Sequence, residues 1–578
     1  MVVTDATAPA ALLAALGALL DRVRTDQMVL ETPGAPAARA NRAEIADQLA
    51  DYVVPRLVQL DAPLLVVVGG STGAGKSTLV NSIVGEPVTE SGVLRPTTRS
   101  PVLAHHPDDA AWFQPDRILP ELPRTAEQGN TSYALRLRST PLVPAGLAIL
   151  DAPDVDSIDQ GNRDLATQLL AAADLWLFVT SAARYADQVP WDYLRRAAER
   201  STSVAVVLDR TSPDGLVEVR GHLARMMTAR GLSDSPLFTV PETAVGPDGL
   251  LPSPVVAPIV AWLHDLARND EARQMIVAHT VDGAVRHNVL RAHDLADAFD
   301  EQAEAAEQLV GAVDRAFGVA TESVAASVTD GSLVRGEVAA RWQDFVGTGE
   351  VLRSVEGKVG RIRSRLVDGV TGKRSKADDV AAAVVHDLAV LLLDHAETAA
   401  ASVTDAWVTS PAGEAIVAAR PGLDRAPRDL RARTERIARD WQQDVYERVR
   451  AVASDKRLNA DYLAFGVPGI GVSLMIAALG AEAPESTEAL RVGRRVLDAI
   501  VTPPVLAGLV DDVATDLRSR AVEVVDAERR RFLDLVPDPA AVREAQSSLR
   551  ETARRADYAR HVDFLDEQLG THRQGGGG

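Results

Sequence analysis

The chain lacks cysteine and has few aromatic residues. With no thiol in 578 residues, disulfide bonds and thiolate metal sites are excluded. Aromatic residues account for 4% of the chain, whereas 46% of the residues are hydrophobic and alanine is abundant, a composition that favours closely packed helices. A chain of this length can bury several cores and corresponds to roughly three to four domains.

Positive charge is also in short supply. The 61 Lys and Arg residues face 81 Asp and Glu residues, so the formal net charge at pH 7 is −20. Such a chain repels a polyanion, and we expect no nucleic-acid partner. No Lys or Arg precedes the apolar run in residues 1–20, which argues against a secretory signal. The absence of cysteine is compatible with a reducing cytoplasm, where we expect the protein to lie.

One lysine is kept where arginine otherwise supplies the positive charge. Lys76 is the only lysine before Lys358, and a compact ammonium can reach between phosphate oxygens where a planar guanidinium is too bulky. It belongs to a segment with the G-x-x-x-x-G-K-S spacing of a phosphate-binding P-loop. An apolar, strand-like run at 64–68 precedes this loop and a helical pattern at 78–84 follows it, as a P-loop requires. The residues that we predict to bind the phosphates here are Gly70, Ser71, Thr72, Gly73, Ala74, Gly75, Lys76, Ser77 and Thr78.

A second motif follows another apolar run, at residues 147–150. Asp151 comes directly after this run, and a carboxylate at the end of a buried strand can hold the water shell of Mg²⁺ opposite the hydroxyl of Ser77. An ABC ATPase would carry a glutamate after this aspartate and an LSGGQ-type stretch before it. Ala152 stands in the glutamate position and no such stretch occurs, so the sequence argues against that class.

A third motif lies between the first two, in a polar loop that contains Thr97 and Thr98. GTPases keep a threonine in such a loop, about twenty residues after the P-loop, where its hydroxyl binds Mg²⁺ and its carbonyl orients the attacking water. We therefore predict that Thr98 binds Mg²⁺ together with Ser77 and Asp151. The residues that we predict to be catalytic are Lys76, Thr98 and Thr72.

Strand-like apolar runs alternate with helical stretches between residues 61 and 267, which indicates an α/β domain with a mostly parallel sheet. The expected strands are 64–68, 147–150, 175–179, 204–208 and 237–240. Strand signals nearly vanish beyond this domain, and we expect an elongated all-α helical bundle or stalk there. Helices are also expected on the N-terminal side, between residues 8 and 60.

The helical part opens with a heptad seam, in which apolar residues follow an unbroken 4-3 spacing typical of a long helix in a bundle or coiled coil. Further helices are expected at 380–403, 430–452, 513–533 and 540–569. The residues of the heptad seam are Val285, Val289, Ala292, Ala296, Phe299, Ala303, Ala306, Val310, Val313 and Phe317. The predicted segments are N-terminal helices at 1–60 that form a neck, a P-loop domain at 61–267, a stalk at 268–461, an apolar tip at 462–512 and returning helices at 513–574.

Two segments suit a lipid surface, and each has an alternative interpretation. Residues 462–481 carry no charge and are nearly as long as the roughly 20 residues that a bilayer span needs, but a buried helical hairpin at a bundle tip has the same composition. Residues 353–376 are rich in Arg and Lys on an amphipathic pattern, which suits anionic headgroups and equally suits the solvated face of a bundle helix.

The three motifs and their order resemble those of the bacterial dynamin-like GTPases, and the P-loop is also similar to that of Era-type GTPases. The resemblance in motif covers residues 64–245. It implies that the chain binds and hydrolyses GTP with Mg²⁺ in a head carried by a helical neck and stalk. It also implies peripheral binding to an anionic membrane, at the inner face of the cell membrane, and assembly as a homo-oligomer or with a paralogue.

The chain departs from the family pattern at three places. Thr72 replaces a glutamine that helps to position water, and Asp154 replaces the glycine of the D-x-x-G switch motif, whose backbone N–H meets the γ-phosphate. The base-reading motif, expected as Asn/Thr-Lys-x-Asp, is degenerate: Asp209 or Asp214 could accept hydrogen bonds from guanine, so the preference for GTP over ATP comes from the resemblance. The remaining residues that we predict to contact the nucleotide are Asp154, Asp209 and Arg210.

Two alternative functions stay open at this point. The chain could be a soluble Era-like regulatory GTPase whose helices bind a protein or RNA, with residues 462–481 in its core. It could also be a nucleotide-gated scaffold with little hydrolysis, as Thr72 and Asp154 suggest.

Overall fold

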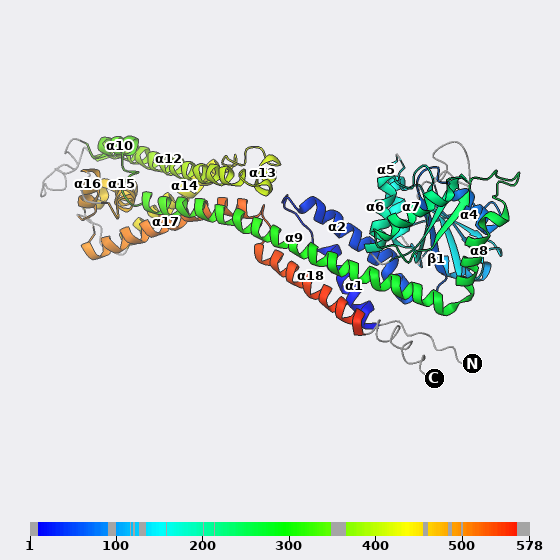
Figure 1. Ribbon diagram of the computed structural model, residues 1–578. Coiled ribbons are helices and arrows are strands. Elements are labelled where there is room, and N and C mark those ends of the chain that lie inside the picture. Colours follow the sequence, from blue (N-terminus) through cyan, green and yellow to red (C-terminus); the bar gives the residue numbers. More distant parts are fainter. Residues whose placement is uncertain are drawn as a thin grey trace. The chain divides into compact units, whose positions relative to one another are not determined.

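The structure is a computed structural model of the 578-residue chain. It divides into two compact units: the first comprises Met1–Met28, Gly34–Asp300 and Val542–Gly578, and the second comprises Val29–Pro33 and Glu301–Ala541. The first unit is α/β and the second is all-helical (Figure 1). The structure describes residues 10–90, 100–115, 117–119, 122–125, 134–157, 159–199, 202–212, 214–347, 366–454, 460–483, 488–498 and 501–562.

The first unit is built on an eight-stranded sheet of order β3-β4-β2-β5-β1-β6-β7-β8. All neighbouring strands are parallel except β2 and β5, which pair antiparallel. The fold is therefore a mostly parallel α/β domain followed by a helical region, as predicted. The strands are β1 (Leu64–Gly70), β2 (Val102–His105), β3 (Arg124–Thr125), β4 (Leu135–Ser139), β5 (Leu147–Asp151), β6 (Leu175–Ser181), β7 (Ser203–Thr211) and β8 (Leu237–Pro241).

The central strands are buried, which is why their sequences were recognisable as strands. All seven residues of β1 and of β6 are buried, because helices cover both faces of a parallel sheet and continuous apolar runs suit such strands. The five predicted strands are confirmed. The short strands β2, β3 and β4 were not predicted. Since β5, β1, β6 and β7 run parallel, their carboxyl ends meet at one edge of the sheet.

Helices from the two ends of the chain belong to the first unit as well. In Figure 1, α2 and α18 run beside α9, and hydrogen bonds join Asn41 of α2 to Arg291 of α9 and Arg550 of α18 to Asp300 of α9. A short π-helix, η1, extends α2. The helices with residues in this unit are α1 (Ala10–Thr25), α2 (Ala35–Gln48), η1 (Leu49–Val53), α3 (Val54–Val58), α4 (Lys76–Val84), η2 (Pro107–Phe113, a 3₁₀ helix), α5 (Gln160–Ala171), α6 (Gln188–Glu199), α7 (Leu216–Thr228), α8 (Ser253–Arg268), the start of α9 (Asp270–Ser327) and α18 (Pro539–Ala559).

Asp174, just before β6, joins the N-terminal helices to the sheet. Its carboxylate accepts hydrogen bonds from the Tyr52 hydroxyl and the Arg56 Nε, both at 3.0 Å, and from the Leu65 amide at 2.8 Å. Its carbonyl accepts a hydrogen bond from the hydroxyl of Thr280 in α9. Burial, followed by the charge of Asp174, raises the pKa of Tyr52 well above its usual value, so the phenol stays a donor.

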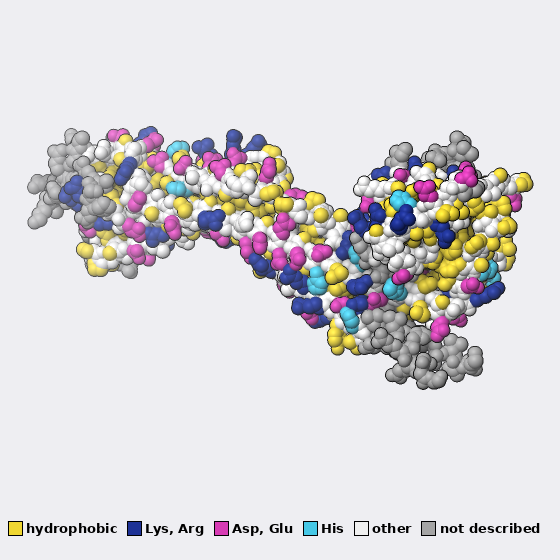
Figure 2. Space-filling model, viewed as in Figure 1, with side chains coloured by type: hydrophobic (Ala, Val, Ile, Leu, Met, Phe, Trp, Pro, Cys, Tyr) yellow, Lys and Arg dark blue, Asp and Glu magenta, His cyan; other side chains and the backbone are white. Residues whose placement is uncertain are grey.

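The second unit is a helical bundle. The heptad seam predicted for α9 begins in the first unit, to which its residues up to Phe299 belong, and continues in the second. Nine of its ten residues are at most 5% exposed, and Val310 is partly buried. Acidic and basic side chains are interspersed along the surface of this unit (Figure 2), with ion pairs such as Arg529 to Asp314 and Arg520 to Asp516. Its further helices are α10 (Gly336–Val346), α12 (Leu366–Trp407), α13 (Pro411–Ala418), α14 (Leu430–Ser454), α15 (Ala460–Leu479), α16 (Glu488–Asp498) and α17 (Pro503–Leu533).

The apolar segment 462–481 lies mostly in α15, which packs inside this bundle. From Val472 to Leu479 every side chain is fully buried, and the helix contacts α12, α14, α16 and α17. Gly466 has non-helical backbone angles two residues before Pro468, so the helix is kinked there. The buried-hairpin interpretation therefore describes the packing of these side chains. None of the helices in the described ranges is long and apolar enough to cross a membrane.

The boundaries of the two units differ from those of the five segments expected from the sequence. Residues 1–28 and 542–578 join the P-loop domain, as do residues 268–300, which the sequence assigned to the stalk. The long helix α9 begins in one unit and ends in the other, which no change of composition marks. Of the basic segment 353–376, only the side chain of Lys376 is among those described, and its Nζ donates to the carbonyl of Asp344 at 3.1 Å.

Candidate nucleotide-binding site

Three glycines shape the loop between β1 and α4. Gly70, Gly73 and Gly75 have φ angles of 146°, 74° and 91°, which side-chain-bearing residues rarely adopt. A Cβ atom at Gly70 would collide with the carbonyl of Val179, and one at Gly75 would collide with the carboxylate of Asp209. The loop therefore needs glycine both for its backbone angles and for its close approach to β6 and β7.

The helix α4 begins at Lys76, directly after this loop. The first backbone N–H groups of a helix have no partner within it, and they carry the positive end of the helix dipole. A phosphate bound in the loop would therefore meet both the N–H groups and the favourable field. The strand, loop and helix expected around residues 70–78 are therefore present, and phosphate binding by these residues stays a prediction.

The ammonium of Lys76 is buried at the centre of the loop, where its side chain is 4% exposed. It donates hydrogen bonds to the carbonyls of Gly70 and Ser71, both at 3.1 Å. It also donates to the carboxylate of Asp154, with which it forms an ion pair. The structure thus brings together Lys76 and Asp154, the residue at the switch glycine position.

Asp151 lies at the end of β5, fully buried, and accepts two hydroxyl hydrogen bonds on Oδ2. Ser77 donates at 2.7 Å and Thr89 at 2.8 Å. Burial raises the pKa of Asp151, whereas these two hydrogen bonds and the charge of Lys76 lower it. Its Oδ1 is buried and has no hydrogen-bond partner among the described residues.

The oxygens of Ser77 and Asp151 fit a magnesium ion that is held partly by the phosphates of a bound nucleotide. Mg²⁺ in nucleotide sites keeps several waters and takes few protein oxygens, with phosphates supplying others. The Ser77 hydroxyl and the unpaired Asp151 Oδ1 can supply one direct oxygen and one acceptor for a bound water. No group of three or more His, Asp or Glu side chains suited to a metal occurs within the described ranges.

A second aspartate, Asp156, contacts the loop next to Lys76. Its Oδ1 accepts hydrogen bonds from the backbone N–H of Thr72 at 2.5 Å and from the Thr72 hydroxyl at 2.7 Å. Its Oδ2 accepts from Arg184, which follows β6, at 2.7 Å. The hydroxyl of Thr72, predicted to be catalytic, is therefore engaged by a carboxylate.

Asp209 is buried near the end of β7, with its carboxylate against Gly75. Burial raises its pKa to about 6, against the lowering effects of the Arg210 amide and guanidinium, and Glu242 raises it further. The amide of Arg210 donates to Asp209 Oδ1 at 2.7 Å, and Arg210 itself has a φ of 53°. The structure thus places Asp209 against the P-loop, whereas Asp214 is exposed at the start of the next turn.

Some predicted residues cannot be compared and some contacts were not predicted. Thr98 and Thr97 lie outside the described residues. Thr89 was not singled out, because nothing in its local sequence shows that it reaches Asp151. Asp156 lies five residues after Asp151 in the run D-A-P-D-V-D, and this density of carboxylates beside a P-loop was the available signal.

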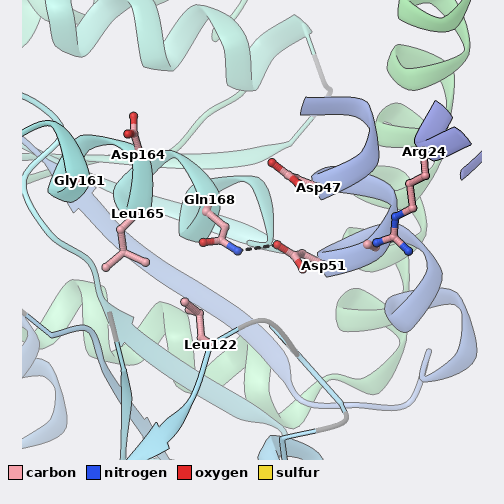
Figure 3. Close-up of a pocket in the computed structure, with 9 residues that line it drawn as sticks. Arg24, Asp47, Asp51, Leu122, Gly161, Asp164, Leu165 and Gln168 are labelled. Carbon is pink, nitrogen blue, oxygen red and sulfur yellow. Dashed lines mark hydrogen bonds between the residues drawn. The ribbon is translucent and has the colours of Figure 1, made fainter. Parts of the chain in front are cut away.

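A cavity lies in the first unit, where α2 and η1 face α5 (Figure 3). Its volume is about 690 Å³. Asp47, Asp51 and Asp164 contribute carboxylates to its lining, and Gln168 donates a hydrogen bond to Asp51 at 2.6 Å. The lining contains no residue of the P-loop, so this cavity is separate from the nucleotide site.

A mostly parallel sheet whose central strand runs into a glycine-rich loop, with lysine and serine opening the next helix, defines a P-loop nucleotide-binding domain. Residues 66–210 match the family described as "Dynamin family". The resemblance to dynamin-like GTPases that the motifs predicted is therefore confirmed for this segment.

Known proteins are similar to parts or all of the chain. The "Probable transmembrane GTPase FZO-like, chloroplastic" of Arabidopsis thaliana is 24% identical over 159 residues, which are 28% of this chain and 16% of that protein. The chain therefore matches only about a sixth of that relative's length.

Two solved structures, both described as an oligomerised bacterial dynamin pair for the long-range sensing and tethering of membranes, align along most of the chain. The first has a TM-score of 0.42 at 10% identity and covers 97% of this chain and 96% of that one. The second has a TM-score of 0.35 at 9% identity and covers 96% of each.

Proposed function

We propose that the chain is a dynamin-like GTPase, which binds and hydrolyses GTP with Mg²⁺ and couples this cycle to a membrane surface. The observation that carries the proposal is the buried Lys76 at the start of α4, framed by glycines and facing the Ser77–Asp151 pair. The match of residues 66–210 to the dynamin family supports GTP as the nucleotide.

Each group has a role that follows from its position. The loop amides and Lys76 bind the β- and γ-phosphates. Ser77 and Asp151 hold the magnesium ion and one of its waters, and Thr89 keeps the Asp151 carboxylate oriented. Magnesium, when bound, neutralises the charge that develops on the phosphates. Thr98 binds the same ion and positions the attacking water, in line with the family resemblance.

The decisive test is nucleotide binding and turnover by the full-length protein and by Lys76→Ala. Wild-type protein is expected to bind GTP with Mg²⁺ and to hydrolyse it, and Lys76→Ala to lose both activities, because it removes the ammonium that bridges the phosphates. Arg554→Ala, which removes an exposed cation on α18, is the control and should behave as wild type. If GTP binding survives Lys76→Ala intact, the assigned site is wrong.

We further propose that the protein binds an anionic membrane peripherally and assembles there with itself or a paralogue. The family resemblance supports this step, and so does the composition of the basic segment 353–376. Co-sedimentation with anionic liposomes, with and without GTP, tests it. Pelleting that is lost when the basic residues are replaced supports the proposal, and a protein that stays in the supernatant contradicts it.

One specific observation favours a second candidate, the nucleotide-gated scaffold with little hydrolysis. The hydroxyl of Thr72, which stands in the position of the family's water-positioning glutamine, is bound to Asp156. GTP turnover at high protein concentration on liposomes separates the two functions, because a scaffold binds GTP without releasing phosphate at a useful rate.

A further inference from the structure

The ammonium of Lys76 has three N–H donors, and the structure shows an acceptor for each. Two acceptors are carbonyls of the loop itself, at Gly70 and Ser71. The third acceptor is the carboxylate of Asp154. A phosphate oxygen can reach this ammonium only by taking the place of the Asp154 carboxylate, because the other two acceptors belong to the loop that forms the site.

Asp154 is part of a segment, residues 152–157, that we call the acidic loop. The loop's second carboxylate, on Asp156, accepts hydrogen bonds from the amide and the hydroxyl of Thr72. The amide of Val155 donates a hydrogen bond to the carbonyl of Gly70 at 3.3 Å. Arg184 holds Asp156 from the side of β6. Three consecutive residues of the acidic loop are therefore bonded to the P-loop or its strand.

We propose that Asp154 is a built-in competitor for the terminal phosphate of the nucleotide. The proposal rests on the proposed function, since it concerns the same site. The Asp154 carboxylate is an anion at hydrogen-bond distance from the P-loop ammonium, so it holds a position that a phosphate oxygen would take. A glycine at this position, as in the D-x-x-G motif, has no group that could do so.

The competition discriminates between di- and triphosphates. A P-loop lysine reaches both the β- and the γ-phosphate. GTP brings a γ-phosphate against Asp154, and because two anions repel each other, the carboxylate has to leave. GDP lacks that group and leaves more room for Asp154. The residue therefore weakens binding of GTP more than binding of GDP, and it links the presence of the γ-phosphate to release of the acidic loop.

The first test is calorimetric titration of the full-length protein with GTP and GDP in the presence of Mg²⁺. Asp154→Asn and Asp154→Gly are expected to bind GTP about tenfold more tightly than wild type, the scale of one charged hydrogen bond, and GDP with a smaller gain. Asp164→Asn, which removes an exposed carboxylate of α5 that contacts Gln160 rather than the P-loop, is the matched control. An unchanged or weaker GTP affinity in both Asp154 variants overturns the proposal.

The second test needs no nucleotide and uses the fact that Lys76 is the only lysine before Lys358. Acylation of the peptide containing residue 76 by an amine reagent, followed by mass spectrometry, reports how readily this ammonium leaves its partners. We expect severalfold faster acylation in Asp154→Asn than in wild type or Asp164→Asn, because one of the three acceptors is weakened. Equal rates in all three proteins overturn the proposal.

The two tests separate the failure of this inference from that of the proposed function. If wild type binds no GTP but both Asp154 variants do, the competition is established and the natural chain is not a GTPase under those conditions. If no protein binds nucleotide, the proposed function fails and the acylation rates alone decide the inference. If wild type binds GTP and the Asp154 variants show no gain, the function stands and the inference falls.

Discussion

Asp209 gives the nucleotide site a pH dependence at the scale of a single residue. Burial raises its pKa from 3.8 to about 6. The folded protein therefore holds this proton more tightly than the unfolded chain, so this contribution to stability is fully present below about pH 4 and is lost as the pH rises through about 6. A shift of about two pKa units corresponds to about 3 kcal/mol, which is an upper estimate of the cost at neutral pH.

We expect Asp209→Asn to raise the free energy of unfolding of the nucleotide-free protein near pH 7 by up to about 3 kcal/mol, because the amide keeps an acceptor for Arg210 without the buried charge. The gain should disappear near pH 4, where the wild-type carboxyl is protonated. Denaturant titrations at a series of pH values measure it. A gain that does not depend on pH would show that the effect arises from packing and not from the charge.

The sequence supports prediction of individual residues only where a motif fixes their spacing. The P-loop glycines, Lys76 and Ser77 could be assigned in this way, and so could Asp151 from its place after an apolar run. The contacts of Thr89 and Asp156 could not, because they depend on how separate segments fold back on the loop. The ion pair of Asp154 with Lys76 likewise needed coordinates, although the substitution itself was visible.

Close packing of α15 is the clearest feature at the scale of an element. A Cβ atom at Gly471 would collide with the ring of Tyr446 in α14, and one at Gly480 would collide with the side chain of Leu490 in α16. Small residues at these two positions let α15 approach its neighbours closely. In contrast, Gly318 in α9 has open space around its Cβ position.

We expect Gly471→Ala to lower the free energy of unfolding of the helical unit by about 1–3 kcal/mol, because a rigid ring has to move. Gly318→Ala is the matched control and is expected to raise it by about 0.5–1 kcal/mol, since alanine is the better helix former and meets no obstacle. Chemical denaturation followed by circular dichroism measures both. If Gly471→Ala is as stable as wild type, α15 is not packed as described.

Composition alone could not decide the place of this helix. An apolar run with glycine and proline suits a bundle core and a lipid surface equally, and only the neighbours Tyr446 and Leu490 show that it is packed among helices. The heptad seam of α9 was predicted correctly because its period is sustained over many turns. The strands β2 and β3 were missed because they are short, and β4 was missed because it alternates leucine with arginine.

At the scale of the whole molecule, the chain has two hydrophobic cores that can unfold separately. The P-loop site lies in the α/β unit, and ligands stabilise only the part of a protein that binds them. We expect calorimetry to resolve two unfolding transitions, of which GTP with Mg²⁺ raises one. At a concentration about 100 times the Kd, the stabilisation is about 2.7 kcal/mol. A single transition that shifts as a whole would show that the two units unfold together.

A substitution of Arg560 can show, without a ligand, which of the two unfolding transitions belongs to the α/β unit. Its guanidinium is nearly buried and pairs with Asp282 of α9 at 2.6 Å. Arg560→Ala leaves that carboxylate without its cation and should cost about 3 kcal/mol in the nucleotide-sensitive transition. Arg554→Ala, an exposed change on α18, should leave both transitions in place. An equal effect of the two substitutions would contradict this assignment.

The bonds of Asp174 also have an evolutionary consequence. Its carboxylate serves Tyr52, Arg56 and the amide of Leu65, while its carbonyl serves Thr280. A substitution that removes this carboxylate leaves the buried guanidinium of Arg56 and the buried phenol of Tyr52 without their acceptor at the same time. Positions 52, 56 and 174 should therefore change together among homologous chains, whatever nucleotide chemistry each of those chains retains.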